Sequence, residues 1–308
     1  MRFGGEWGSR QRNFAYILSE HWSAHEGWRR VRLLERGPRP GYLFASRMRT
    51  EAIAMSSPQI VTAAVLVIGD EILSGRTKDK NIGYIAEYMT ALGVDLREVR
   101  VVADVEEEIV SAVNALRSRY TYVFTTGGIG PTHDDITADC VAKAFGAPLE
   151  FHPEAVAILK QRLAKMGGEL NEARMRMTRI PRGATLVANK VSGAPGFWIG
   201  NVIVMAGIPN VMQAMLDEVA PKLKTGAKLL SETIRADAKE GDVGTELGLV
   251  AKAHPETIIG SYPFFDEKLG PNTNIVVRSR DPAKLAQVKV AVEDMLKTVK
   301  ARLAAGQA

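Results

Sequence analysis

The chain has 308 residues, of which 46% are hydrophobic and 24% charged, a composition typical of a globular protein with enough apolar material for a sizeable core. No apolar run approaches the roughly 20 residues that a membrane-spanning helix needs. A single cysteine, Cys140, excludes an intramolecular disulfide and a cysteine-rich metal site. These features predict a protein of a reducing, cytoplasmic compartment that has no membrane partner.

The net charge of +5 arises entirely in the first 54 residues, which hold ten Arg, no Lys and five Glu. The rest of the chain carries equal numbers of basic and acidic side chains, so the charge does not indicate nucleic-acid binding. Residues 1–54 show no sustained periodicity, and we expect a disordered or non-native extension, with the natural start at Met55. A transit peptide is the alternative, which the five Glu oppose.

From Ile60 onward, strands and helices alternate in the predicted structure. This succession is typical of a parallel sheet that helices cover on both faces. The predicted strands are 60–68, 95–102 and 120–126, the helices are 81–92, 105–118 and one that ends near 145, and the connecting loops after the strands are 69–81, 103–105 and 127–135.

The stretch 120–145 predicts a strand, a glycine loop and a helix. Its first seven residues are aromatic or β-branched, as in a buried parallel strand, and apolar side chains recur at helical spacing after the loop. Glycines let the backbone approach a phosphate, and the following helix offers free N–H groups and the positive end of its dipole. We expect an anion to bind at Thr126, Gly127, Gly128, Gly130, Pro131 and Thr132.

Two adjacent carboxylates, Asp134 and Asp135, follow the glycines directly. They would repel a phosphate unless a cation or a proton lies between them, so the pair predicts a bound divalent metal ion, Mg²⁺ in the first place. A capping box is the alternative, in which Thr132 caps the helix and Asp135 folds back to its start. The residues alone leave both interpretations open.

Polar side chains follow each of the three predicted strands. Because the carboxyl ends of parallel strands meet at one edge of a sheet, we expect these side chains to lie within reach of one ligand. They are Asp70, Glu71, Asp79 and Asn81, which follow Gly69 in the first loop, Asp104 in the second loop, and Asp134 and Asp135 in the third.

Further elements are predicted between residue 145 and a second glycine turn. Gly207 and Pro209 in that turn precede a helix, and the turn therefore offers a second set of backbone donors. We interpret Met175 and Met177 as packing residues, and Cys140 as a small core residue and not a nucleophile. The predicted elements are a helix over 153–166, a short strand or extended link over 181–187, a hairpin over 194–206 and a helix over 211–223.

Residues 229–302 predict a compact α+β module with one helical face. KH domains clamp a nucleic-acid backbone through a Gly-x-x-Gly loop between helices. No such loop is predicted here, so we expect packing or homo-oligomerisation and no nucleic-acid partner. The predicted strands are 229–236, 256–262 and 273–279, and the helices are 240–253 and 282–302.

Three stretches carry a specific resemblance to a known family. They read Val-Ile-Gly-Asp-Glu-Ile-Leu-Ser-Gly (67–75), Asp-Lys-Asn (79–81) and Thr-Thr-Gly-Gly-Ile-Gly-Pro-Thr-His-Asp-Asp-Ile-Thr (125–137). They resemble the MoaB/Mog molybdopterin-binding domain, in the version at the amino end of the competence/damage-inducible CinA proteins. The last module resembles the KH-like domain that follows it there. The expected domains are therefore the extension 1–54, a MoaB/Mog-like domain over 58–226 and a KH-like domain over 228–303.

The resemblance implies a three-layer α/β/α fold with a mostly parallel sheet that binds a small molecule, a pterin or an adenine nucleotide, at its carboxyl edge. In the adenylyltransferase branch of the family, the functional carboxylates correspond to Asp104 and Asp135, which we expect to be catalytic. CinA-type relatives are associated with metal-dependent hydrolysis of ADP-ribose, and the similar domain of eukaryotic FAD synthases with FAD hydrolysis.

The chain departs from the family in two respects. The family usually has Pro-Gly-Val-Pro followed by Ser or Gly and then Glu, whereas this chain reads Ala-Gly-Ile-Pro-Asn-Val over 206–211, so Val211 replaces an acidic contact. The deamidase domain of full CinA proteins and the FAD-synthesising domain do not occur in this sequence, and we infer neither activity.

Three functional hypotheses follow from the sequence. The first is a metal-dependent pyrophosphatase for an ADP-ribose- or FAD-like dinucleotide, with Mg²⁺ held by Asp135 and helped by Asp104 or Asp134. The second is adenylyl transfer to molybdopterin by the same residues. The third is a pterin or nucleotide carrier without turnover, which the altered loop 206–211 favours.

Overall fold

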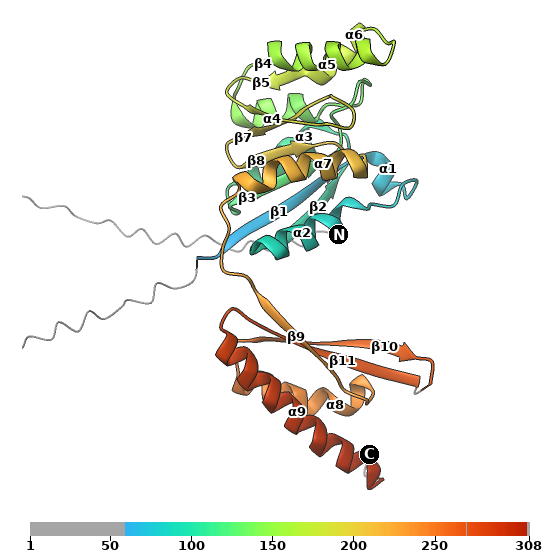
Figure 1. Cartoon of the computed structure of the whole chain (residues 1–308), viewed down its shortest axis with the longest axis vertical. Helices are drawn as coiled ribbons and strands as arrows, with labels where there is room; N and C mark the ends of the chain where they lie inside the picture. Colours follow the sequence, from blue (N-terminus) through green and yellow to red (C-terminus); the bar gives the residue numbers. More distant parts are fainter. Residues whose placement is uncertain (1–58, 269, 307–308) are drawn as a thin grey trace, which may run out of the picture. The chain divides into compact units, whose positions relative to one another are not determined.

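The computed structural model describes residues 59–268 and 270–306 (Figure 1). The extension expected over 1–54 and the proposed start at Met55 lie outside these residues. The described part contains a six-stranded sheet with its helices, followed by a three-stranded module, and each is considered by itself. No helix in the described ranges has the length and apolar character needed to cross a membrane.

The larger sheet is mostly parallel, as predicted, with the strand order β2-β1-β3-β8-β7-β6. β1 pairs in parallel with β2 and β3, and β3 pairs in parallel with β8. The hairpin predicted over 194–206 is β7 and β8, and β6 and β7 extend the sheet in antiparallel pairing. The strands are β1 (Val61–Ile68), β2 (Val94–Val102), β3 (Tyr122–Thr126), β6 (Thr185–Val187), β7 (Gly196–Ile199) and β8 (Val202–Met205).

Helices cover both faces of this sheet, which confirms the expected three layers (Figure 1). On one face, α2 and α7 contribute the buried Met89 and Met212, and on the other α3 and α4 contribute Ile109 and Cys140. Burial raises the pKa of the Cys140 thiol to about 12, in agreement with its interpretation as a core residue. The helices are α2 (Asn81–Leu92), α3 (Glu106–Arg117), α4 (Thr137–Phe145) and α7 (Pro209–Val219).

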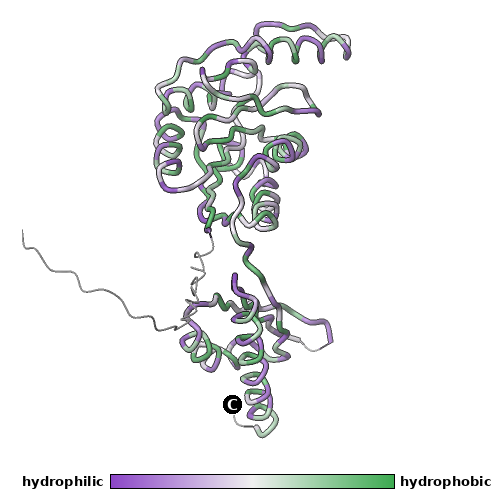
Figure 2. The backbone as a smooth tube through the Cα atoms, turned by 60° about the vertical axis from the view of Figure 1, so that its left-hand side comes forward, coloured by the Kyte–Doolittle hydropathy of each residue, from purple (hydrophilic) through white to green (hydrophobic). Residues whose placement is uncertain are grey.

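Hydropathy follows these layers. In Figure 2 the strands of the larger sheet are mainly hydrophobic, whereas the helices that cover it alternate between hydrophobic and hydrophilic residues. All eight residues of β1 except Thr62 are buried, as expected of a central strand with helices on both sides. The apolar run that begins at Ile60 is therefore explained by burial from two faces.

Shorter elements fill the remaining connections. The segment 181–187 is not one strand, because a turn at Gly183, with φ of 86°, separates β5 from β6 and the two belong to different sheets. The loop after β1 contains a short helical turn, α1, that the sequence did not predict. These elements are α1 (Asp70–Leu73), β4 (Leu149–Phe151), α5 (Pro153–Lys165), α6 (Glu172–Met175), the 3₁₀ turn η1 (Arg176–Thr178), β5 (Arg179–Pro181) and the 3₁₀ turn η2 (Ala220–Lys222).

The last module has the predicted β-α-β-β-α order and an antiparallel sheet, β10-β11-β9. Both helices pack on this sheet through a core that includes Val243, Ile275 and Val288. Gly241 and Gly244 have the Gly-x-x-Gly spacing, but both lie inside α8 and not in a loop between helices. The elements are β9 (Leu230–Arg235), α8 (Glu240–Ala253), β10 (Ile258–Asp266), β11 (Gly270–Ser279) and α9 (Pro282–Ala304).

Candidate functional site

A cavity of about 520 Å³ opens at the carboxyl ends of β1, β3 and β8. This is the edge at which the alternation of strands and helices placed the ligand. Its walls come from the turn after β1, the loop after β3, the turn after β8 and the loop between β6 and β7, with Met177 of η1 added. Segments more than 130 residues apart in the sequence thus contribute to one site.

The glycine loop presents three consecutive free backbone donors to this cavity. The N–H groups of Gly128, Ile129 and Gly130 have no acceptor in the described part of the chain, whereas the N–H of Gly127 donates to the Met205 carbonyl at 3.2 Å. All three residues line the cavity. Successive N–H groups of this kind form a concave nest that suits an anion.

The glycines themselves are required by the close approach of other protein atoms. A Cβ atom on Gly127 would lie 2.1 Å from the Ile68 carbonyl oxygen, and one on Gly128 would lie 2.1 Å from Oγ1 of Thr137. Both glycines have positive φ, 104° and 65°. The glycine pattern therefore has a structural cause, and it is the free N–H groups that indicate an anion site.

Two carboxylates lie over glycine backbone at the same cavity. A Cβ atom on Gly130 would lie 2.6 Å from Oδ2 of Asp135, and one on Gly69 would lie 2.5 Å from Oε2 of Glu71. Both carboxylates belong to residues that line the cavity. A phosphate on the glycine loop would therefore meet two negative charges, which a bound cation would offset.

Asp135 makes part of the contact that the capping interpretation predicted. Its Oδ2 accepts hydrogen bonds from the backbone N–H of Thr132, at 2.8 Å, and from the Thr132 hydroxyl. However, α4 begins at Thr137 after Ile136, so Thr132 is not the helix cap and the capping box is wrong. The contact closes a turn within the loop and leaves Oδ1 of Asp135 without a donor among the described residues.

Asp104 lies beside the turn that carries Glu71. Its Oδ2 accepts the backbone N–H of Asp70 at 3.0 Å, which fixes the start of α1. Burial raises the pKa of the Asp104 carboxyl above its ordinary value, and the charges of Asp70, Glu71 and Asp134 act in the same direction, against the hydrogen bond from Asp70. Asp104 thus positions the Glu71 turn and does not line the cavity itself.

Asp134 has different surroundings from Asp135. Its side chain is 62% exposed and does not line the cavity. Hydrogen bonding to Thr132 lowers the pKa of its carboxyl, and the charges of His133 and Arg176 contribute to the same shift. The structure therefore separates the two adjacent carboxylates, with Asp135 at the cavity and Asp134 in solvent.

The second glycine turn is held against the first. The Asn81 side-chain amide donates to the Gly207 carbonyl at 2.8 Å, and a Cβ atom on Gly207 would lie 3.3 Å from the Cα atom of Gly127. Asp79 accepts the N–H groups of Asn81 and Ile82 at 3.1 and 2.8 Å, which starts α2. Asp79 and Asn81 thus fix the walls without lining the cavity.

Much of the remaining lining of the cavity is apolar. Val211 is only 5% exposed and lines the cavity at the position where the resemblance led us to expect an acidic contact. The Asn189 amide closes its own loop through Ser192 and Ala194, at 2.6 and 3.0 Å, so it is not aimed at a ligand. Such a wall suits a planar ring held by dispersion. The apolar lining residues are Ile129, Met177, Ala194, Ala206, Ile208, Val211 and Met215.

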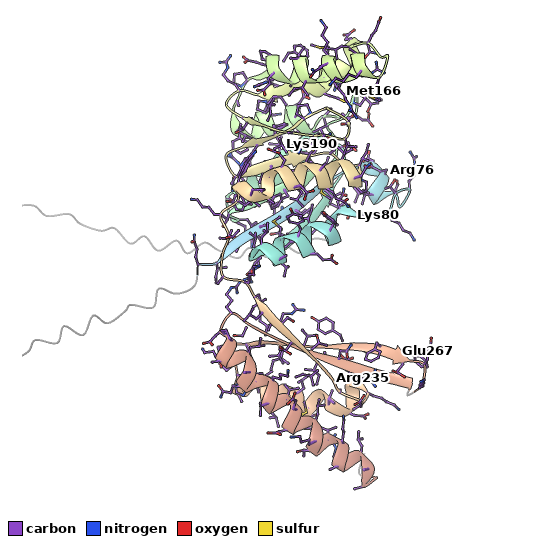
Figure 3. The ribbon with its side chains drawn as sticks, in the orientation of Figure 1. Arg76, Lys80, Met166, Lys190, Arg235 and Glu267 are labelled. Carbon is purple, nitrogen blue, oxygen red and sulfur yellow. The ribbon has the colours of Figure 1, made fainter. Side chains whose placement is uncertain are left out.

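Exposed cations lie near the rim of this cavity. Arg76 and Lys80 project from the loop between α1 and α2, and Lys190 projects from the loop after β6 (Figure 3). Their neighbours Thr77 and Asn189 line the cavity.

The structure brings together about half of the residues that the sequence assigned to the ligand. Eight line the cavity, namely Glu71, Gly127, Gly128, Gly130, Pro131, Asp135, Gly207 and Pro209. The others adjoin it or position it, namely Gly69, Asp70, Asp79, Asn81, Asp104, Thr126, Thr132 and Asp134. Sequence reasoning missed Thr77, Asn189 and Ser192 and the apolar wall, and only the polar turn around Asn189 offered a local signal.

The donor set fits a metal ion that a substrate helps to hold. Among residues 59–268 and 270–306, no group of three or more His, Cys, Asp or Glu side chains is arranged to hold a metal by itself. A magnesium ion bound to phosphates needs only one or two protein carboxylates. Asp135 and Glu71 are the carboxylates that line the cavity together with the glycine loop.

Comparison with known families gives two matches along the chain. The family described as "Probable molybdopterin binding domain" matches residues 64–225, and the one described as "FAD synthase, middle domain" matches residues 228–302. The first match covers more than half of the chain, and the chain belongs to this molybdopterin-binding family. Within it, the chain is of the MoaB/Mog type and CinA-like.

Individual relatives and one solved structure are similar to parts of this chain. A CinA-like protein of Gemmatimonas aurantiaca is 35% identical over 201 residues, 61% of this chain and 47% of that protein. A probable FAD synthase of Caenorhabditis elegans is 31% identical over 263 residues, 78% of this chain and 50% of that protein. This chain spans about half the length of both relatives. A crystal structure of CinA from Thermoplasma acidophilum, described as of unknown function, is 33% identical and covers 53% of this chain and 98% of that chain, with a TM-score of 0.49.

Proposed function

We propose that this protein binds a nucleotide-like ligand through its pyrophosphate and hydrolyses it with the help of a divalent ion such as Mg²⁺. The observation that supports this most directly is the run of three free N–H groups at Gly128, Ile129 and Gly130, beside the carboxylates of Asp135 and Glu71. Donors for phosphate oxygens next to ligands for a hard cation match the needs of a pyrophosphate bond.

Each part of the cavity has a role in this reaction. The N–H groups of the glycine loop bind phosphate oxygens, and the apolar wall around Met177 and Val211 holds a ring of the ligand. Asp135 and Glu71 would hold the ion, and Asp104 keeps the turn that carries Glu71 in place through the Asp70 backbone N–H. When bound, the ion offsets charge on the phosphates and lowers the pKa of a bound water. An ADP-ribose- or FAD-like dinucleotide has both the pyrophosphate and the rings that such a site accepts.

Two other functions use the same cavity. Adenylyl transfer to molybdopterin would place the same carboxylates and glycine loop around the phosphates of ATP, and the match to a molybdopterin-binding domain supports a pterin ligand. A carrier without turnover is favoured by Val211, which leaves the wall of the second glycine turn without a charged group. Assays with ADP-ribose, with FAD, and with ATP plus molybdopterin, each with several divalent ions, separate the three.

Asp135→Asn tests the catalytic assignment. Asn keeps an oxygen that accepts the N–H of Thr132, so we expect the free energy of unfolding to change by less than about 1 kcal/mol. Loss of the charge at the ion should cost roughly 3 kcal/mol in the barrier, or about a hundredfold in rate. Melting temperature and hydrolysis are measured on the same preparation.

Asp134→Asn is the matched control, because Asp134 is the adjacent carboxylate but does not line the cavity. We expect it to retain most of the activity. A fully active Asp135→Asn protein would show that Asp135 is not needed for the reaction. Equal losses of activity in both variants would show that Asp134 is as important for metal binding as Asp135.

A further inference from the structure

Three arginines lie close together in the sequence, in a segment that adjoins the glycine loop. Arg174 lies in α6, Arg176 begins η1 and Arg179 begins β5. Arg176 and Arg179 line a small second cavity together with Gly128, Gly130 and Asp135, and the last three residues also line the larger cavity. The positive charge of these arginines therefore lies beside the glycine loop that carries the free N–H groups.

The three arginines differ in their partners. Arg179 makes two hydrogen bonds with the Asp139 carboxylate, at 2.9 and 2.6 Å, so its charge is neutralised. Arg174 donates to the Glu169 carbonyl. Arg176 donates from Nη2 to the Asp135 carbonyl at 3.3 Å, its Nε is buried without an acceptor, and no carboxylate of the described residues pairs with it.

A partly buried guanidinium without a counter-charge is unfavourable unless something else supplies the charge. The Asp135 carbonyl gives Arg176 a dipole but no charge. An anion on the N–H groups of Gly128 and Gly130 would complete the charge balance.

We propose that Arg176 is a positioning residue of the anion site, whose charge, acting through the glycine loop, makes the cavity selective for ligands that carry phosphate groups. It does not touch the ligand. It donates to the carbonyl of Asp135 and places a positive charge beside the glycine loop that binds the phosphate. This assignment rests on the phosphate-binding part of the proposed function and not on hydrolysis.

Three substitutions separate the charge of Arg176 from its hydrogen bond. Arg176→Lys keeps the charge, whereas Arg176→Gln keeps an N–H donor for the Asp135 carbonyl and loses the charge. Arg174→Gln is the matched control, because it removes a neighbouring positive charge that is absent from the linings of both cavities. Binding of inorganic pyrophosphate, ADP-ribose and adenosine is measured by calorimetry with metal removed, at several salt concentrations, together with the melting temperature.

We expect Arg176→Gln to weaken the binding of pyrophosphate and ADP-ribose at least tenfold, to leave the affinity for adenosine within about twofold and to flatten the salt dependence. Arg176→Lys and Arg174→Gln should stay close to the unchanged protein. Unchanged anion affinity in Arg176→Gln would overturn the assignment, and so would an equal loss in the Gln and Lys variants, or no anion binding by the unchanged protein.

Because the measurement uses no metal and no turnover, it is independent of the hydrolysis assay. A protein that binds ADP-ribose through Arg176 but does not cleave it would remove the proposed reaction and leave the anion site intact. If the Arg176→Gln protein cleaves ADP-ribose as well as the unchanged protein, the role of Arg176 in the anion site is wrong and the proposed reaction stands.

Discussion

The Asp104 carboxylate fixes the start of α1 but lowers the stability of the folded protein. Its Oδ2 holds the Asp70 backbone N–H at 3.0 Å, while burial and the nearby charges of Glu71 and Asp134 raise the pKa of its carboxyl. A raised pKa in the folded state means that the ionised carboxylate is less favourable there than in the unfolded chain. At neutral pH, Asp104 therefore lowers the free energy of unfolding.

Asp104→Asn should accordingly stabilise the protein at pH 7, since Asn retains an oxygen for the Asp70 N–H. The gain should shrink as the pH falls through the folded-state pKa towards the ordinary value of 3.8, because the Asp104 carboxyl is then protonated in both states. Urea unfolding at a series of pH values measures this.

Asp134→Asn serves as a control of opposite sign. The pKa of the Asp134 carboxyl is lowered in the folded state, so its contribution to stability is present at neutral pH and is lost as the pH falls. A gain from Asp104→Asn that is the same at all pH values would show that its cause is not the ionisation of Asp104.

At the scale of elements, two hydrogen bonds connect the glycine loop after β3 to the first residue of α4. The Thr137 N–H donates to the Gly128 carbonyl and its hydroxyl donates to the Gly127 carbonyl, each at 3.0 Å. The first turn of α4 is therefore bonded to the loop that precedes it. This explains why α4 begins at Thr137 and not after Thr132, which the sequence offered as a helix cap.

Gly128→Ala should disrupt this junction. Ala would have to adopt a φ of 65°, and its Cβ would meet Oγ1 of Thr137 at 2.1 Å. Gly146→Ala is the matched control, because Gly146 has a φ of 61° at the other end of α4 with nothing within 4 Å of its Cβ position. We expect the control to lose about 1 kcal/mol from backbone strain and Gly128→Ala to lose roughly 1–3 kcal/mol more from the clash.

Urea unfolding of the two glycine variants gives this difference, and anion binding gives its functional consequence. Gly128→Ala should also lose affinity for pyrophosphate, since the clash moves the N–H groups that follow it, whereas Gly146→Ala should keep it. Equal stabilities for the two variants would mean that Thr137 yields to the new methyl group without cost.

For the whole molecule, the described residues contain their own cores. The larger sheet has an apolar cluster on each face, and the last module has a third cluster around Val243 and Val288. The described residues therefore form three apolar clusters of their own.

A protein that begins at Met55 should therefore keep its melting temperature and its affinity for pyrophosphate. Thermal unfolding and calorimetry of the two chain lengths test this at matched ionic strength, because the removed segment carries a charge of +5 that attracts anions at low salt. A fall of several degrees in the shorter protein would show that the segment packs on the folded part.

Local pattern predicted the main helices and strands of this protein. The helix predicted over 81–92 is α2, which ends where Gly93 adopts a φ of 77°, and the strand predicted over 95–102 is β2, one residue longer. Apolar periodicity and a glycine stop depend on neighbours in the sequence, so the sequence alone is sufficient for them. The parallel order of strands also placed the site at their carboxyl edge.

Only the tertiary structure decided which side chains meet at that edge. Asp135 and not Asp134 lines the cavity, and Glu71 lines it from a helical turn that the sequence did not predict. Arg176 contacts Asp135 although the two are 41 residues apart in the sequence. The apolar wall comes from Met177, Val211 and other residues of separate segments. These placements arise from packing between distant parts of the chain, and no local pattern carries that information.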